Sequence, residues 1–178
     1  MKTPEGFQQC YNAQAAVDAQ SQVIVACDVS NQSPDVQQLR PMLEEVRALN
    51  GRYPAELTAD AGYASEANFE ALAEAKTHAV IALRRYHRDE PPDADPAPAG
   101  STNRWPHRNE MRRRLMTAEG KELYKKRKQT VEPVFGQIKG ARGFRQFLRR
   151  GQDAVRSEWA LLCTVHNLLK LAQAPQPA

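Results

Sequence analysis

The sequence is poor in cysteine and has no long hydrophobic segment. Its three cysteines, Cys10, Cys27 and Cys163, lie far apart in a chain of 178 residues. They are too few and too scattered to form the disulfide framework of a small secreted domain. No stretch offers the roughly 20 consecutive apolar residues of a membrane helix, and none resembles a signal peptide. We therefore expect a cytoplasmic protein that makes no contact with a membrane.

Histidine is also scarce, which argues against a structural zinc site. None of the four histidines is paired with a cysteine or another histidine at the spacing of zinc ligands. His166 lies in the apolar run 161–171, where a packed histidine is expected rather than a catalytic one. The four are His78, His87, His107 and His166.

Charge is distributed very unevenly along the chain. Residues 1–103 carry 8 Lys and Arg against 15 Asp and Glu, whereas residues 104–150 carry 15 against 4. Trp105, Phe144 and Phe147 are interleaved with these cations. A solvated basic face is one explanation of such a run. The density of cations together with aromatic residues favours a nucleic-acid surface.

The first third of the chain predicts a β-hairpin followed by a helix. Residues 11–17 alternate apolar and polar, and residues 23–29 are almost continuously apolar, so we expect a half-exposed strand paired with a better buried one. Ser33-Pro34-Asp35 predicts a helix start, and apolar residues then recur at helical spacing until Asn50-Gly51. Pro41 should kink this helix or delay its start.

Strand and helix patterns alternate in the next segment. A short strand ends at Asp60, a helix opened by Ser65 follows with Phe69, Leu72 and Ala73 facing inward, and residues 78–83 predict another strand. Strands separated by helices are typical of crossover units, so we expect a partly parallel sheet.

Composition divides the rest of the chain. Residues 89–100 hold 4 of the 12 prolines and no aliphatic side chain larger than alanine, which predicts a loop or disordered insert. Thr117 can cap a helix that runs toward Lys139. A last helix over 153–172 should dock through Val155, Trp159, Leu162, Val165 and Leu169. The predicted divisions are a partial sheet with helices at 1–88, a Pro-rich then basic linker at 89–116, a helical part at 117–172 and a tail at 173–178.

Two acidic residues are placed where phosphoryl-transfer chemistry needs them. Asp60 ends a strand before a glycine turn, and Glu132 lies on a predicted helix among lysines. Mg²⁺ prefers carboxylate oxygens, and two such ions about 3.5–4 Å apart can assist phosphodiester cleavage. Each acid also has an ordinary explanation, because Asp60-Ala61-Gly62 is a common turn and Glu132 can pair with Lys128.

Four separated motifs occur in the order found in one enzyme family. Together they resemble the DDE transposases of bacterial insertion sequences, and the resemblance covers nearly the whole chain. The motifs are residues 6–18 (GFQQCYNAQAAVD), residues 59–63 (ADAGY), residues 124–139 (YKKRKQTVEPVFGQIK) and residues 158–168 (EWALLCTVHNL).

The resemblance implies a ribonuclease H-like α/β core with C-terminal helices. The family cuts and rejoins double-stranded DNA at element ends and targets, using three carboxylates, two Mg²⁺ ions, water and a DNA 3′-hydroxyl. Asp60 matches its second acid and Glu132 its third, both as catalytic residues and metal ligands. Four residues separate Arg127 from Glu132 here, where some branches have three. The expected DNA contacts are Tyr124, Arg127, Lys128, Lys139, Arg142 and Arg145.

The family's first acid has no counterpart among these motifs. It lies on the first strand of the fold, upstream of the hairpin, whereas Asp18 ends the second strand. The chain is therefore expected to lack the first strand at the centre of the sheet and to be catalytically incomplete. A non-catalytic DNA-binding remnant of a decayed element is the alternative, and an unrelated α/β phosphohydrolase is a more distant one. A second copy or an intact transposase is a possible protein partner.

Overall fold

The computed structural model describes residues 2–3, 6–7, 10–83 and 105–174. The described chain is mixed α/β, with short strands and five α-helices. It divides into two compact units. Unit 1 comprises residues 1–34 and 128–178, and unit 2 comprises residues 35–127. The boundary between them lies within helix α4 (Ala118–Gly136).

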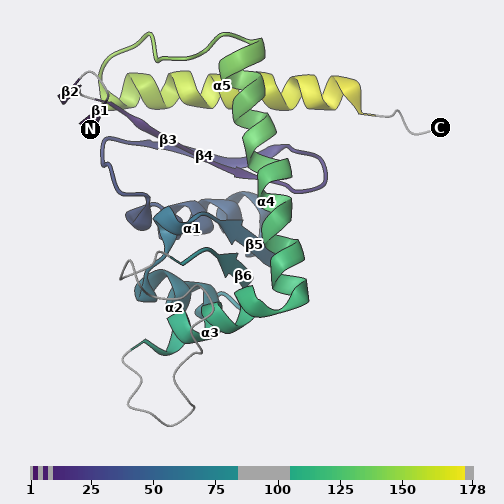
Figure 1. Ribbon diagram of the computed structural model, residues 1–178. Coiled ribbons are helices and arrows are strands. Elements are labelled where there is room, and N and C mark those ends of the chain that lie inside the picture. The colour runs from purple at the N-terminus through teal and green to yellow at the C-terminus, as the bar shows by residue number, and fades with distance from the viewer. Residues whose placement is uncertain (1, 4–5, 8–9, 84–104, 175–178) are drawn as a thin grey trace. The chain divides into compact units, whose positions relative to one another are not determined.

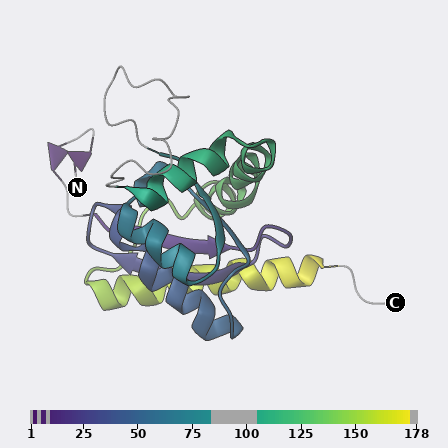
Figure 2. The ribbon, with the colours of Figure 1, turned by 90° about the horizontal axis from the view of Figure 1, so that it is seen from below.

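Unit 1 is built on an antiparallel hairpin. Strand β3 (Asn12–Val17) pairs with β4 (Ile24–Ser30), as the alternating pattern predicted. The tight turn between them is held by Asp18, whose Oδ2 accepts hydrogen bonds from the backbone N–H and the hydroxyl of Ser21. Helix α5 (Gln152–Gln173) lies alongside the hairpin in both ribbon views (Figures 1 and 2). A further short pair, β1 (Lys2–Thr3) and β2 (Gly6–Phe7), precedes it.

The buried face of α5 differs in part from the predicted one. Val165 and Leu169 were expected to face the core, but they are 38% and 43% exposed. Their places are taken by Cys163 and His166, because residues 155, 159, 162, 163 and 166 follow one face of a helix with 3.6 residues per turn. The buried residues are Val155, Trp159, Leu162, Cys163 and His166.

The polar atoms on this face all find partners. The indole Nε1 of Trp159 donates to the carbonyl of Gln14 at 2.9 Å, and its ring stacks on Phe135. His166 is fully buried, as a packed histidine was expected to be. Its Nε2 lies 2.9 Å from the Gln22 carbonyl and its Nδ1 lies 3.3 Å from Arg142, so the ring is fixed at both nitrogens.

Unit 2 contains the predicted crossover. Strand β5 (Glu56–Ala59) pairs in parallel with β6 (His78–Ile81), and helix α2 (Glu66–Glu74) connects them. Ser65 caps α2 by accepting the N–H of Asn68, as predicted. Helix α1 (Leu39–Asn50) begins late, after the single turn η1 (Asp35–Gln37), which agrees with a delay imposed by Pro41. It ends at Gly51, whose φ of 72° suits glycine.

One expectation for this region is wrong. Ala73 is exposed, and the inward face of α2 instead uses Asn68, Phe69, Ala71 and Leu72. The described strands form three two-stranded sheets, of which β5–β6 is the parallel pair.

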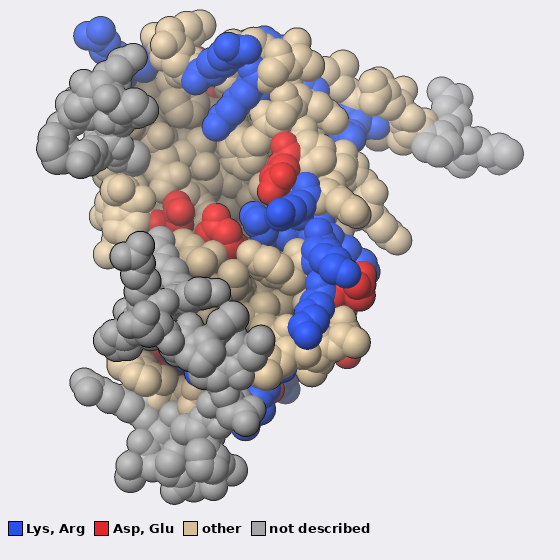
Figure 3. All heavy atoms as spheres, in the orientation of Figure 1, with Lys and Arg blue, Asp and Glu red and all other residues tan. Residues whose placement is uncertain are grey.

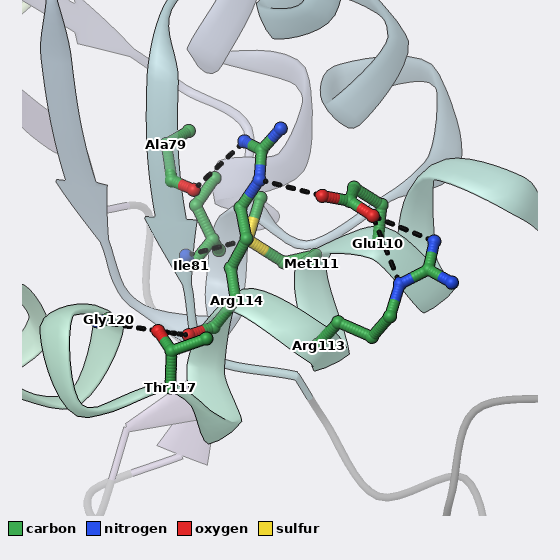
Figure 4. Close-up of polar contacts among 8 residues, drawn as sticks. All are labelled: Ala79, Ile81, Glu110, Met111, Arg113, Arg114, Thr117 and Gly120. Carbon is green, nitrogen blue, oxygen red and sulfur yellow. Dashed lines mark hydrogen bonds and ion pairs between the residues drawn. The ribbon is translucent and has the colours of Figure 1, made fainter.

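Helix α3 (Pro106–Met116) occupies the end of the predicted linker, while residues 89–104 lie outside the described residues. The carboxylate of Glu66 accepts the N–H groups of His107 and Arg108, so it satisfies two donors at the start of this helix. Met111 packs in the core of unit 2 and its sulfur accepts the N–H of Ile81 (Figure 4). The helix is therefore part of unit 2.

A tight corner joins α3 to α4. The hydroxyl of Thr117 donates to the Arg114 carbonyl at 2.7 Å and accepts the N–H of Gly120 at 2.9 Å, which confirms Thr117 as a cap (Figure 4). Helix α4 then continues through Pro133 to Gly136. A π-helical turn, η3 (Gln137–Ala141), follows directly.

Glu110 on α3 joins two arginines. It contacts Arg113 at 2.7 Å and Arg114 at 3.3 Å, and Arg114 also reaches the Ala79 carbonyl on β6 (Figure 4). Partial burial alone would raise the pKa of Glu110, but hydrogen bonds and charge from both arginines outweigh it. The pKa is therefore held below its ordinary value of 4.5.

We predict that Glu110→Gln lowers the free energy of unfolding by about 1 kcal/mol at most at pH 7, because the pairs are partly exposed. A depressed pKa stabilises the fold above pH 4.5 and ceases to do so as pH falls through the lower folded-state value. The difference between wild type and variant should therefore shrink toward pH 3. Urea unfolding at several pH values measures it, and a difference that grows on acidification would contradict the assignment.

Candidate acidic site and nucleic-acid interface

Asp60 stands at the carboxyl end of β5, where the strand stops and the turn η2 (Ala61–Tyr63) begins. The side chain is exposed, and its Oδ1 accepts the N–H of Gly62 at 2.7 Å. This bond fixes the direction of the carboxylate. Its other oxygen, Oδ2, has no hydrogen bond to any residue that the structure describes. Asp60 is thus oriented by the chain and still open to a ligand.

A second carboxylate borders the same turn. If Gly62 carried a Cβ, that atom would lie 2.8 Å from Oδ1 of Asp60 and 2.8 Å from Oδ2 of Asp35. The two oxygens are therefore at most twice that distance apart. A side chain at position 62 would fill the space between them. From the sequence, Asp35 was expected only to form part of a helix start.

The buried amide of Asn68 holds the two turns together. Its Nδ2 donates to the Val36 carbonyl at 2.7 Å and to the Tyr63 carbonyl at 2.8 Å. Asn68 is only 4% exposed, so these bonds are shielded from water. They connect the residue after Asp35 to the residue after Gly62. The sequence carried no signal for this role, because an asparagine within a predicted amphipathic helix is usually solvent-facing.

Glu132 lies on the part of α4 that belongs to unit 1. It is exposed, and Lys128 precedes it by four residues on the same continuous helix. Asp60 belongs to unit 2, so the convergence of the two acids stays a prediction.

The remaining signature residues have local aromatic contacts. The guanidinium of Arg127 lies over the Tyr124 ring, 5.5 Å from its centroid. The Lys139 ammonium lies 5.4 Å from the centroid of Phe135. Cations held over rings in this way are attracted by the ring quadrupole and keep a defined direction.

Unit 1 gathers cations around an aromatic hollow. The hollow has a volume of about 240 Å³, and its lining includes Phe144, Phe147, Lys139 and Arg145. Aromatic rings beside cations suit a nucleic-acid strand, because bases stack on the rings while phosphates meet the cations. Lys and Arg side chains also gather along α4 on the face shown in Figure 3. The exposed cations of unit 1 include Lys128, Lys139, Arg145, Arg149 and Arg150.

Other basic residues are already engaged within the protein. Arg113 and Arg114 share Glu110, and Lys125 pairs with Glu122. Arg142 is half-buried against His166. These contacts make them weaker candidates for phosphate binding than the exposed cations of unit 1.

The part of the chain that the structure describes contains no cluster of three or more potential metal ligands among its His, Cys, Asp and Glu residues. None of its helices combines the length and apolar character needed to cross a membrane. Its three cysteines are free thiols.

Comparison with known proteins supplies the family. Neither the curated proteins nor the solved structures contain a match. One family model, described as a transposase DDE domain, matches residues 2–168, which is almost the entire chain. The motifs around Asp60 and Glu132 both lie inside the match, and so do both units' cores. The chain therefore belongs to the transposase DDE domain family.

Proposed function

We propose that this chain acts in DNA transposition by binding DNA and contributing Asp60 and Glu132 to metal-dependent strand cleavage and transfer. The observation that carries the proposal is the exposed, oriented Asp60 at the end of β5, inside a match to the DDE family. The parallel β5–α2–β6 crossover and the β3–β4 hairpin support a ribonuclease H-like origin for the core.

The residues beside Asp60 fit the divalent metal that the family uses. Mg²⁺ takes hard oxygen ligands, and Asp60 Oδ2 is open to one. The missing Cβ at Gly62 leaves room next to that carboxylate. When bound, Mg²⁺ supplies Lewis acidity at the phosphodiester. Asp60 and Glu132 would hold it.

The chain's own residues would position the DNA. Lys139 and Arg145 border the aromatic hollow of unit 1 and offer charge to phosphates, while Phe144, 37% exposed, offers a ring to a base. Arg127, whose guanidinium lies over the Tyr124 ring, is five residues before Glu132 on α4, and Tyr124 is eight residues before it. Both would support that acid. A second copy or an intact transposase would be the protein partner.

The first acid of the family has no counterpart among the motifs of this chain, and we propose that the chain as it stands binds DNA without cutting it. The alternative function is that of a non-catalytic DNA-binding remnant. Such a protein would not cleave DNA either, but Asp60 would have no role in it. Metal binding at Asp60 therefore distinguishes the proposed function from this alternative.

We predict that the purified chain binds DNA with little sequence preference and a steep dependence on salt. Each phosphate contact contributes about −0.9 to the slope of log affinity against log salt. Replacing Lys128, Arg145 and Arg149 together by glutamine should flatten the slope by about 0.9 for each contact that is lost. Fluorescence anisotropy with a labelled duplex measures both quantities.

The matched control for this experiment is Arg156→Gln. Arg156 is also an exposed cation of unit 1, but its guanidinium is paired with Asp28 at 2.8 Å. Its loss should leave the salt slope unchanged. A wild-type affinity that does not respond to salt would overturn the assignment of this surface.

We predict that Asp60 and Glu132 hold the same metal site. Asp60→Asn and Glu132→Gln should each weaken the binding of the same Mn²⁺ ion, because either variant removes one of its carboxylate ligands. Titration followed by the electron paramagnetic resonance of free Mn²⁺ measures the affinity and the number of ions bound. Two bound ions, of which each variant loses a different one, would show separate sites.

We predict that the purified chain does not nick or join plasmid DNA in Mg²⁺ or Mn²⁺. Gel electrophoresis of supercoiled plasmid detects a single nick. Metal-dependent nicking that Asp60→Ala abolishes would instead show that the chain is an active enzyme.

A further inference from the structure

We propose that Leu148 is a wedge that enters double-stranded DNA between neighbouring base pairs. It is carried by a segment that we call the basic loop, residues 143–151 (GFRQFLRRG). The inference rests on the proposed function, because the partner is the same DNA, and it adds an apolar side chain to the cations and rings assigned there. The basic loop runs from the end of η3 to the start of α5 and belongs entirely to unit 1 (Figure 1).

The exposure and surroundings of Leu148 are the first support. At 76%, it is more exposed than any other large apolar side chain in the part of the chain that the structure describes. Exposed arginines at positions 145, 149 and 150 precede and follow it. An apolar side chain among cations suits a partner with an anionic surface and an apolar interior. The phosphates and stacked bases of DNA provide both, and leucine is one of the residues that proteins insert between base steps.

The backbone of the tip is held by one carboxylate, which is the second support. Glu158 on α5 accepts the N–H of Leu148 at 2.9 Å and the N–H of Arg149 at 3.0 Å. Hydrogen bonds to a charged acceptor are stronger than those between neutral groups. The helix that carries Glu158 is itself packed in the core of unit 1 through Trp159. A wedge must keep its position while it separates base pairs, and these two bonds hold the tip.

Aromatic contacts fix the basic loop on either side of the tip. The Phe147 ring makes edge-on contacts with the rings of Tyr11 and Trp159, with centroids 6.3 Å apart in both cases. The N–H of Gly151 donates to the Tyr11 hydroxyl at 3.0 Å. Phe147 therefore packs against the protein, while the next side chain, Leu148, faces solvent.

An exposed leucine alone would not indicate a partner, because protein surfaces commonly carry them. Leu161 and Leu171 on α5 are 63% and 72% exposed. Leu148 differs from both because it lies among three exposed arginines, and because residues 144–147 of the same loop line the aromatic hollow. A second copy fits this surface poorly, since a symmetric contact would place the arginines of one loop against those of the other.

The experiment uses a short duplex with 2-aminopurine at several positions, so that a wedge is detected in any binding register. The fluorescence of 2-aminopurine rises when the base is unstacked. The purified wild-type chain at saturating concentration should raise it. Leu148→Ala should abolish the rise and weaken DNA binding about tenfold, because the leucine side chain is no longer removed from water. Leu148→Met, which keeps a long apolar side chain, should retain most of the rise.

Leu171→Ala is the matched control, because it removes an equally exposed leucine from the same unit. It should keep the wild-type fluorescence and affinity. Glu158→Gln tests the anchor. It should reduce the rise while the dependence of affinity on salt stays unchanged, because the cations that determine the salt slope remain. Circular dichroism melting shows whether each variant is folded, and the exposed Leu148 variants carry the test if Glu158→Gln is not.

The outcomes separate this inference from the proposed function. If wild type binds DNA with the predicted salt dependence and Leu148→Ala gives the wild-type fluorescence, the wedge is refuted and the proposed function stands. If wild type does not bind DNA, both proposals fall. A Leu148→Ala variant that changes the sedimentation coefficient of the free chain, but not the fluorescence, would identify a contact between copies instead. Loss of the rise in Leu148→Ala, with Leu171→Ala unaffected, establishes the wedge.

Discussion

The candidate site depends on one buried amide. Asn68 is nearly inaccessible to solvent, and both of its Nδ2 hydrogens are used, one on each of two single-turn helices that the chain forms far apart in sequence. A buried amide donor without a partner destabilises the fold by about 1–3 kcal/mol. Movement of either turn away from Asn68 is therefore unfavourable. The nearness of Asp35 and Asp60 follows in part from this constraint, because the two bonds hold the backbone next to Asp35 and next to Gly62.

In unit 1, a side-chain amide likewise satisfies backbone groups at the edge of a strand. Asn167 on α5 accepts the N–H of Ile24 and donates to its carbonyl, both at 2.8 Å, where the register of β3 and β4 shifts. The side chain thus replaces a missing strand partner. His166 and Trp159 satisfy two more backbone carbonyls from the same helix. One helix therefore supplies both the apolar cover of the hairpin and the hydrogen bonds that its irregular backbone requires.

Local patterns in the sequence predicted much of the fold. The Asp60 strand, the Ser65 cap and the hairpin were evident because period-2 alternation and capping residues act within a few positions. The inward face of α5 was mistaken at Val165 and Leu169, because several apolar residues lie on both sides of this helix and only packing selects between them. The part played by Asn68 could not be found from the sequence, since it arises from a hydrogen bond across 32 positions. No periodic pattern reports such contacts.

Gly120 shows that a glycine can enforce stiffness. A Cβ at this position would lie 1.9 Å from the Arg114 carbonyl oxygen, which is backbone and cannot turn aside. Every other amino acid would have to push α3 away from the start of α4. The absence of a side chain at Gly120 therefore allows α3 and α4 to come this close, and van der Waals contact between the two helices fixes the angle of the corner. Position 120 should tolerate no substitution without reshaping the corner, although its residue makes no contact through a side chain at all.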